Sequence, residues 1–225
     1  MHPKRFIAFE GISGSGKSTL IKELSKKIDN SYLTNWFSLN YFKQIGSTIN
    51  SQIPMTPDIF SLIYALEFYA RLETQIIPRY EDGICILAHR YIYTPFAHDS
   101  VRGVKSTYLE YLYANVMMPK VLFFIDTPPE LAYERIIKER KPSFYECGFD
   151  IKYFNDISLG RKIYSEESLD SKQLFESFLN FQTKVYNNYL NILKKSEQVI
   201  VIPGDISSDK QSTIISEKLH EIGYL

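Results

Sequence analysis

The sequence predicts an α/β fold in which a doubly wound, parallel five-stranded sheet carries helices on both of its faces. Apolar runs of strand length recur at residues 6–9, 84–88, 121–125 and 199–202, and residues 32–37 can form a further strand. Segments with the apolar rhythm of helices separate these runs. Strands that alternate with helices form parallel sheets with right-handed crossovers, and strands covered on both faces read as unbroken apolar runs. We expect one domain over residues 1–225, a length that suits a single domain.

The helices are expected between these runs, with proline, aspartate and glycine marking their ends. After a break at 54–57, Asp58 is expected to cap a long helix that runs toward Ile77 and ends at Pro78. Residues 143–170 are expected to be irregular. The other expected helices cover residues 17–28, 107–117, 128–141, 172–193 and 212–222.

Composition excludes several classes of function. Hydrophobic residues make up 44% and charged residues 23%, and Lys+Arg and Asp+Glu balance at 26 each. The net charge of the chain therefore gives no overall attraction to nucleic acid or to an acidic membrane. The chain has no signal-peptide pattern and no apolar run of membrane-spanning length, so we expect a cytoplasmic protein. Cys85 and Cys147 have neither metal-ligand nor redox spacing.

The segment Phe6–Thr19 reads as a buried strand, a glycine-rich turn and the start of a helix, and it satisfies the pattern G-x-x-x-x-G-K-[ST]. Glycines let backbone N–H groups point at phosphate oxygens, and the helix N-terminus adds partial positive charge. Lys17 would neutralise the β- and γ-phosphates of a nucleotide, and Ser18 would ligate Mg²⁺. A chance glycine turn would lack the flanking strand and helix. We predict a phosphate-binding loop made of Gly11, Ser13, Gly14, Ser15, Gly16, Lys17, Ser18 and Thr19.

Ligands of open parallel sheets bind beyond the carboxyl ends of the strands. In this chain those ends are Glu10, His89, Asp126 and Gly204. Asp126 is compatible with two roles, a magnesium ligand or a cap for the next helix. Trp36, near the end of another strand, is expected to pack in the core rather than to contact a ligand.

Five segments, in order, resemble the thymidylate kinase family of nucleoside monophosphate kinases. They are FEGISGSGKST at 9–19, FYAR at 68–71, the run from Ile76 to Tyr91, PKVLFFIDTPPELAYERI at 119–136 and RKPSFYECG at 140–148. The resemblance implies a three-layer P-loop kinase fold with a short lid at approximately 136–150. It also implies phosphoryl transfer from ATP with Mg²⁺ to a (deoxy)nucleoside monophosphate, with dTMP or a related pyrimidine nucleotide as the expected acceptor.

The same resemblance implies roles for residues matched by position. Arg90 would hold the acceptor phosphate, and Arg71 would lie near the acceptor base and phosphate. Phe68 would stack on the base, but it stands three residues before Arg71 where the family spacing is four, so Tyr64 competes for this role. The implied acceptor-binding residues are Glu10, Tyr64, Phe68, Arg71, Arg90, Thr94 and Asp99.

The resemblance further implies that the lid supplies cations, with Arg135 and Arg140 acting on the phosphates beside Lys17 and Arg90. A solvated basic helix end is the alternative explanation for these arginines. Gly204 and Asp205 would contact the adenine of ATP. Members of the family form homodimers through helices, so a homodimer is expected here as well.

Two positions depart from the family pattern. Ser13 stands where the P-loop commonly carries an acidic residue, and His89 stands where the family has the aspartate of Asp-Arg-Tyr. That aspartate helps to hold magnesium, whereas a neutral imidazole offers no hard oxygen. His89 could be structural, could donate to phosphate, or could mark a loss of catalysis. Three functions therefore stay open at this point: a nucleoside monophosphate kinase, a deoxynucleoside kinase, and a nucleotide-binding protein without turnover.

Overall fold

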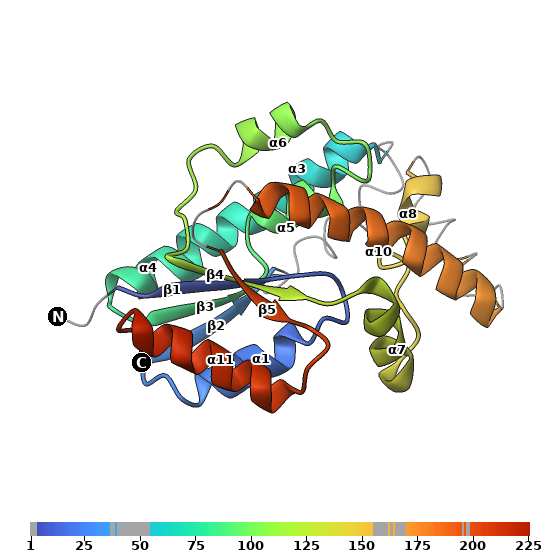
Figure 1. Cartoon of the computed structure of the whole chain (residues 1–225). Coiled ribbons are helices and arrows are strands. Elements are labelled where there is room, and N and C mark those ends of the chain that lie inside the picture. Colours follow the sequence, from blue (N-terminus) through green and yellow to red (C-terminus); the bar gives the residue numbers. More distant parts are fainter. Residues whose placement is uncertain are drawn as a thin grey trace.

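The core of the protein is a five-stranded sheet in which every strand is parallel to its neighbours. The computed structural model describes residues 4–36, 39, 55–154, 162, 164, 170–194, 196 and 199–225. The strands are β1 (Phe6–Glu10), β2 (Ser31–Asn35), β3 (Cys85–His89), β4 (Val121–Asp126) and β5 (Val199–Pro203), in the order β2-β3-β1-β4-β5. The predicted parallel α/β fold is confirmed (Figure 1).

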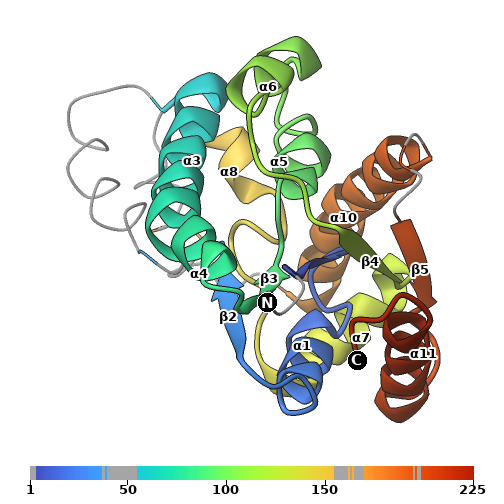
Figure 2. The ribbon, with the colours of Figure 1, turned by 90° about the vertical axis from the view of Figure 1, so that its left-hand side faces the viewer.

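Helices cover both faces of the sheet, as the unbroken apolar strands predicted. On one face lie α1 (Lys17–Ser25) and α11 (Ser208–Glu221), packed over alternate side chains such as Ile7 and Leu87. The other face is covered by α3 (Pro57–Arg71), α5 (Tyr93–His98) and α10 (Ser171–Leu193). The end-on view in Figure 2 separates the two layers.

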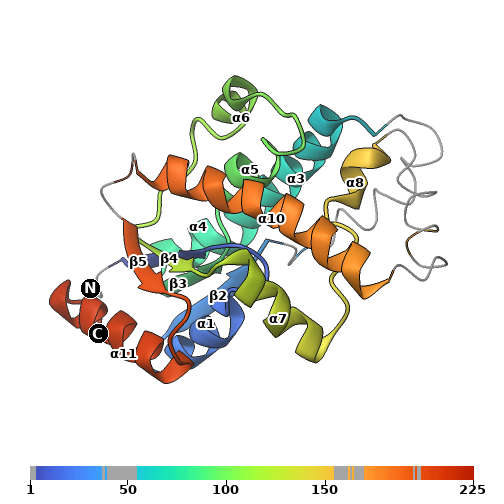
Figure 3. The same ribbon diagram turned by 45° about the vertical axis from the view of Figure 1, so that its right-hand side comes forward.

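The register of the central strands brings polar groups to one edge. Strand β1 pairs with β3 on one side and β4 on the other, so that Phe9 lies opposite both His89 and Phe123. The carboxyl ends of all three strands therefore open at the same place, which is where ligands of this sheet topology bind. Helix α7 (Pro129–Glu139) and α8 (Phe149–Lys152) lie beyond this edge (Figure 3).

The long helix after the break differs from its prediction at both ends. Thr56, rather than Asp58, is the N-cap, and its side chain accepts a hydrogen bond from the Ile59 amide at 3.3 Å. The helical path also continues past Pro78, where we expected it to stop. Proline lacks an N–H and its ring clashes with the carbonyl four residues earlier. The chain widens into a π-helix at Leu72–Ile76, which places Pro78 in the first turn of α4 (Ile77–Glu81), where no N–H is needed.

Several other helices were missed or given different bounds by the sequence patterns. Helix α5 was not predicted, because Pro95 lies inside it. Helix α6 (Ser106–Leu112) is shorter than expected. Asp170 begins α10 with a capping box, close to the expected start, and α11 begins at Ser208, four residues before the predicted start, with Ser207 as its N-cap. None of the described helices has the length and apolar content needed to cross a bilayer.

Candidate active site

The phosphate-binding loop joins β1 to α1 and wraps around its own lysine. Gly14, with a φ of 79°, lies against α7: a Cβ there would lie 2.5 Å from the Ala132 carbonyl oxygen. The Lys17 Nζ atom donates to the Gly11 carbonyl at 3.0 Å, the Ile12 carbonyl at 2.7 Å and Ser15 Oγ at 2.8 Å. Burial, and then the charge of Arg90, lower the pKa of Lys17 well below 10.5. An anion bound beside Lys17 would act in the opposite direction and favour the charged ammonium group.

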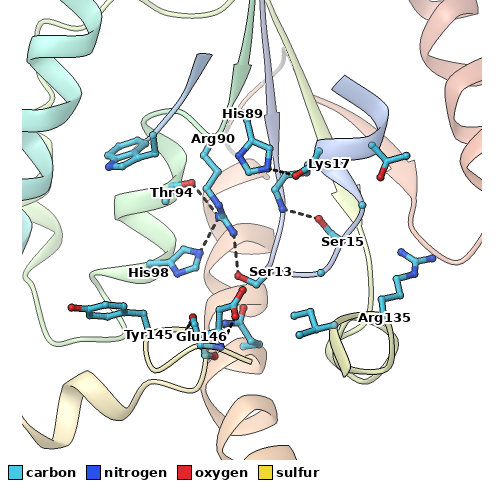
Figure 4. A pocket seen from close by; sticks show the side chains of 18 of the residues that line it. Ser13, Ser15, Lys17, His89, Arg90, Thr94, His98, Arg135, Tyr145 and Glu146 are labelled. Atoms are coloured by element: carbon cyan, nitrogen blue, oxygen red, sulfur yellow. Dashed lines mark hydrogen bonds between the residues drawn. The ribbon is translucent and has the colours of Figure 1, made fainter. Parts of the chain in front are cut away.

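One cleft of about 790 Å³ runs from this loop across the carboxyl edge of the sheet. It joins groups from the P-loop, β3, α5, the lid and α11. The described residues predicted for the site that line the cleft are Ser13, Gly14, Ser15, Gly16, Lys17, Ser18, Thr19, Tyr64, Arg90, Thr94, Asp99, Arg135 and Arg140. The structure therefore brings the predicted donor side and most of the predicted acceptor side together (Figure 4).

Arg90 is held firmly at the middle of the cleft. Its backbone has a φ of 66°, in the left-handed region that arginine rarely adopts. Its Nη1 atom lies 3.3 Å from Thr94 Oγ1, 3.1 Å from His98 Nε2 and 3.1 Å from the Tyr189 hydroxyl. A side chain fixed by three partners is pre-oriented, so it can bind an anion with little further loss of entropy.

Glu10 supports this arrangement from below the cleft. Its carboxylate accepts hydrogen bonds from the Tyr91 amide, the Thr94 hydroxyl and the Tyr189 hydroxyl, each at 2.8 Å. Burial raises the pKa of Glu10, while the nearby Arg90 charge and these donors oppose the rise. Glu10 does not line the cleft among the described residues, so its contribution is to fix the groups that orient Arg90.

The lid segment carries two arginines that have different partners. Arg135, on α7, donates from Nη2 to the Gly204 carbonyl at 2.6 Å, and it lies beside the P-loop, because a Cβ at Gly16 would lie 3.9 Å from Arg135 Nη1. Arg140 forms a two-point pair with Glu146, with both nitrogen–oxygen distances at 2.7 Å. Although burial acts in the other direction, Arg140 and the Ser143 amide hold the pKa of Glu146 below its ordinary value.

Comparison with known proteins decides the family. The profile described as thymidylate kinase matches residues 9–174. The probable thymidylate kinase 2 of Saccharolobus solfataricus is 34% identical over 203 residues, which cover 88% of this chain and 87% of the relative. The probable thymidylate kinase of Pyrobaculum aerophilum is 29% identical over 69% of this chain and 82% of its own length.

The chain belongs to the thymidylate kinase family. A more distant member, the thymidylate kinase of Aster yellows witches'-broom phytoplasma, is 25% identical over 96% of this chain and 97% of its own length. The resemblance inferred from the sequence is therefore confirmed, and the protein is a nucleoside monophosphate kinase by family. The family match ends at residue 174, so most of α10 and all of α11 lie beyond it.

Two residues carried over from the thymidylate kinase pattern lie in the core instead of the cleft. Phe68 is 0% exposed and packs against Trp36, with ring centroids 5.1 Å apart. Arg71 is also fully buried, and its guanidinium lies over the Trp36, Phe68 and Tyr91 rings at 5.2, 5.5 and 5.9 Å. Burial lowers the pKa of Arg71 to about 10. Neither side chain lines the cleft, whereas Tyr64 does. Tyr64 is therefore better placed than Phe68 to stack on an acceptor base.

Trp36 both packs in the core and lines the cleft, although packing alone was expected. The contact follows from its position one residue beyond β2, where the core meets the open edge of the sheet.

Gly204 and Asp205, the residues expected to contact adenine, lie just before the segment of this loop that lines the cleft. Gly204 is buried against β4, where a Cβ would lie 2.0 Å from Thr127 Oγ1 and 2.4 Å from the Asp126 carbonyl oxygen. Gly204 and Asp205 do not line the cleft among the described residues. The residues that do so follow them directly and are Ile206, Ser207, Ser208 and Gln211.

Neither expected role of Asp126 matches its contacts. The carboxylate accepts a hydrogen bond from the Tyr186 hydroxyl at 2.6 Å, and Asp126 is not among the described cleft residues. The N-cap of α7 is instead Pro128, which makes no side-chain capping bond. Local sequence could not reveal Tyr186, which lies 60 residues away on α10.

Arg102 and Gln182 are among the polar cleft residues that sequence reasoning missed. Arg102 is buried between the Phe60 and Phe181 rings, at 5.1 and 4.9 Å, and forms an ion pair with Asp150. Gln182, on α10, donates from Nε2 to the Glu146 carbonyl at 2.8 Å and ties the lid to this helix. Both lie outside the motifs that the thymidylate kinase pattern supplies, so only the fold could reveal them.

Asp99 leads to a prediction about stability and pH. Burial raises the pKa of its carboxyl from 3.8 to about 6, although Arg102 and the Ser61 hydroxyl oppose the rise. The folded state therefore binds more protons at Asp99 than the unfolded state, and the free energy of unfolding falls as pH rises from about 4 to about 6. Two pKa units correspond to about 3 kcal/mol. Unfolding curves measured at several pH values should therefore show a smaller fall in the free energy of unfolding between about pH 4 and 6 for Asp99→Asn than for the unmodified protein. The same pH dependence in both proteins would contradict a raised pKa at Asp99.

Proposed function

We propose that this protein transfers the γ-phosphoryl group of ATP to dTMP, giving ADP and dTDP. The observation that carries the proposal is a single cleft shared by Lys17 in the P-loop and by Arg90, oriented across from it. Relatives that align over nearly the full chain carry the name thymidylate kinase. Two cations that line the same cleft suit two substrates that both carry phosphate.

The chemistry needs position and charge rather than a protein nucleophile, because phosphoryl transfer passes through a highly charged transition state. Lys17 and the N-terminus of α1 would bind the donor phosphates, and Arg90 would bind the acceptor phosphate. Arg135 and Arg140, in a lid at about 136–150, would neutralise charge on the transferred group. An opposite charge at about 4 Å contributes on the order of 4 kcal/mol at an effective dielectric near 20.

A divalent cation, when bound with ATP, would offset charge on the β- and γ-phosphates. Ser18 Oγ, at the start of α1, is a hard oxygen that could ligate such an ion. No group of three metal-ligating side chains occurs among the described residues. The fit to Mg²⁺ therefore depends on phosphate oxygens and water for most ligands, which is usual for this ion.

The test is a coupled ADP-release assay on a panel of nucleosides and monophosphates, with ATP and Mg²⁺. We expect the highest kcat/KM with dTMP. Activity on thymidine with none on any monophosphate would instead identify a deoxynucleoside kinase. Tight ATP binding without transfer to any acceptor would identify a nucleotide-binding protein that has lost turnover, an alternative motivated by His89 and Ser13.

We also propose a cytoplasmic homodimer. Helix α3 exposes two leucines one turn apart, Leu62 at 50% and Leu66 at 52%. Such an apolar stripe on a helix suits a second copy of the same helix across a twofold axis. Light scattering coupled to gel filtration should give twice the chain mass of 26.3 kDa, and Leu62→Glu with Leu66→Glu should give the single mass.

A further inference from the structure

Arg102 continues the wall of the cleft that begins at Arg90. Arg90 Nη1 lies 3.1 Å from His98 Nε2 (Figure 4), and the His98 ring lies 6.1 Å from the Phe181 ring. The Arg102 guanidinium lies 4.9 Å from that same Phe181 ring. Arg90, His98 and Arg102 all line the cleft. A monophosphate bound by Arg90 therefore has this wall beside it, with a second guanidinium farther along.

Arg102 also lies close to Tyr64, the aromatic that is placed to stack on an acceptor base. The Phe60 ring lies 5.1 Å from the Arg102 guanidinium and 4.6 Å from the Tyr64 ring, and all three side chains line the cleft. Burial raises the pKa of Tyr64 well above 10, and the nearby charge of Arg102 opposes this rise. A base that stacks on the Tyr64 ring would thus have the Arg102 guanidinium near its edge.

The Arg102 guanidinium has N–H groups to spare. Its Nε atom donates to Asp150 Oδ2 at 2.5 Å. Its Nη2 atom lies 3.5 Å from the Tyr145 carbonyl oxygen, which is a weak contact, and its Nη1 atom lies 3.8 Å from Asp99 Oδ1, beyond hydrogen-bond distance. Among the described residues, the N–H groups of Nη1 and Nη2 therefore have no acceptor at ordinary hydrogen-bond length, and they can meet a ligand.

The charge of Arg102 is already balanced, and this decides which kind of group it can bind. The buried Asp150 carboxylate forms an ion pair with it, and the Asp99 carboxyl lies on its other side. A phosphate here would add negative charge beside these two acids, and like charges repel strongly where water is excluded. A neutral carbonyl oxygen accepts an N–H without adding charge. The position therefore suits a base carbonyl rather than a phosphate.

We propose that Arg102 determines base specificity by donating hydrogen bonds from its Nη atoms to the O4 carbonyl of thymine in the acceptor. The proposal rests on the proposed function, because it concerns the base of the same acceptor. Cytosine carries an amino group in place of O4, so N–H donors would face each other and the buried donors of Arg102 would lose their acceptor. Arg102 thus takes the base contact that the family pattern implies for Arg71, whose side chain lies in the core.

Binding of dTMP and 5-methyl-dCMP to the full chain tests the proposal, because these nucleotides differ only at position 4 of the base and in the adjoining N3 proton. Isothermal titration calorimetry should show dTMP bound about 10- to 100-fold more tightly, the range for a hydrogen bond to a charged group. Equal binding of the two nucleotides by the unmodified protein would overturn the proposal.

The variant Arg102→Met with Asp150→Asn removes the donors and leaves no buried charge without its partner. Its preference for dTMP should be at least about tenfold smaller. Asp150→Asn alone is the matched control and should retain the preference, as should Arg79→Met, which removes an arginine stacked on the Tyr32 ring outside the cleft. If the double variant does not fold, as judged by thermal unfolding, Arg102→Lys replaces it, because it keeps the ion pair and loses the fork. An unchanged preference in the folded variant would refute the assignment.

A second probe, 4-thio-dTMP, separates the O4 contact from other effects of the substitution. Sulfur is a weak hydrogen-bond acceptor, and this analogue keeps the N3 proton. The unmodified protein should bind it about tenfold more weakly than dTMP, whereas the double variant should bind the two almost equally. A loss of the same size in both proteins would place the O4 contact on another residue and overturn the proposal.

Both measurements record binding, so they do not require turnover. If dTMP is preferred through Arg102 but no acceptor is phosphorylated in the ADP-release assay, the proposed function fails while the specificity assignment stands. If dTMP is phosphorylated and its preference is unchanged in the folded variant, the specificity assignment fails alone.

Discussion

Replacing Arg90 with alanine should lower kcat/KM for dTMP by about 10²- to 10³-fold, the range seen when one preorganised charge or donor is removed from a transition state. The guanidinium is fixed by Thr94, His98 and Tyr189 and lies across the cleft from Lys17. The variant leaves these three partners in place, so the loss should come from the missing cation. The KM for dTMP should rise, while the affinity for ATP should change much less.

Two further substitutions separate the charge of Arg90 from its backbone conformation. Arg90→Lys keeps the charge but not the forked geometry that binds phosphate at two points, so it should recover only part of the activity. Arg90→Gly loses the cation and also relieves the left-handed backbone at φ 66°. It should be as inactive as Arg90→Ala but more stable to heat. Full activity in Arg90→Ala would remove this residue from the acceptor site.

The sheet and the donor side of the cleft were predictable because their signals are local. Four of the five strands are apolar runs, and the spacing of the P-loop motif is local, so the sequence alone predicted the loop from which Lys17 and Ser18 line the cleft. Secondary-structure ends were less certain. Pro78 ends a helix by local rules, but a π-helical turn allows the chain to continue through it.

The acceptor side was less predictable because its contacts join distant segments. Family spacing put Phe68 and Arg71 near the substrate, whereas packing against Trp36 and Tyr91 puts both side chains in the core. Tyr189, which contacts Arg90, lies 99 residues farther along the chain, and Gln182, which contacts Glu146, lies 36 residues farther along. No sequence motif predicts such residues, because their role depends on the tertiary structure that brings α10 over the cleft.

Lys17→Met should abolish phosphoryl transfer, with a loss of at least about 10³-fold, and should do so without unfolding the protein. The ammonium group is 3% exposed and is bound by three oxygen atoms of the P-loop. Taking a charge out of water is costly, and a neutral side chain of similar length removes that cost. We therefore expect the nucleotide-free variant to be at least as stable as the unmodified protein.

Thermal unfolding with and without ATP makes the two effects of Lys17→Met visible together. A ligand at one hundred times its dissociation constant stabilises a protein by about 2.7 kcal/mol, so saturating ATP should raise the melting temperature of the unmodified protein. The variant should show little of this shift, because it lacks the cation that meets the phosphates. Lys218→Met, at an exposed position on α11 paired with Glu221, removes a lysine without touching the cleft and should retain the full shift. A normal ATP shift in Lys17→Met would mean that the buried lysine serves the fold of the loop and not the binding of the donor.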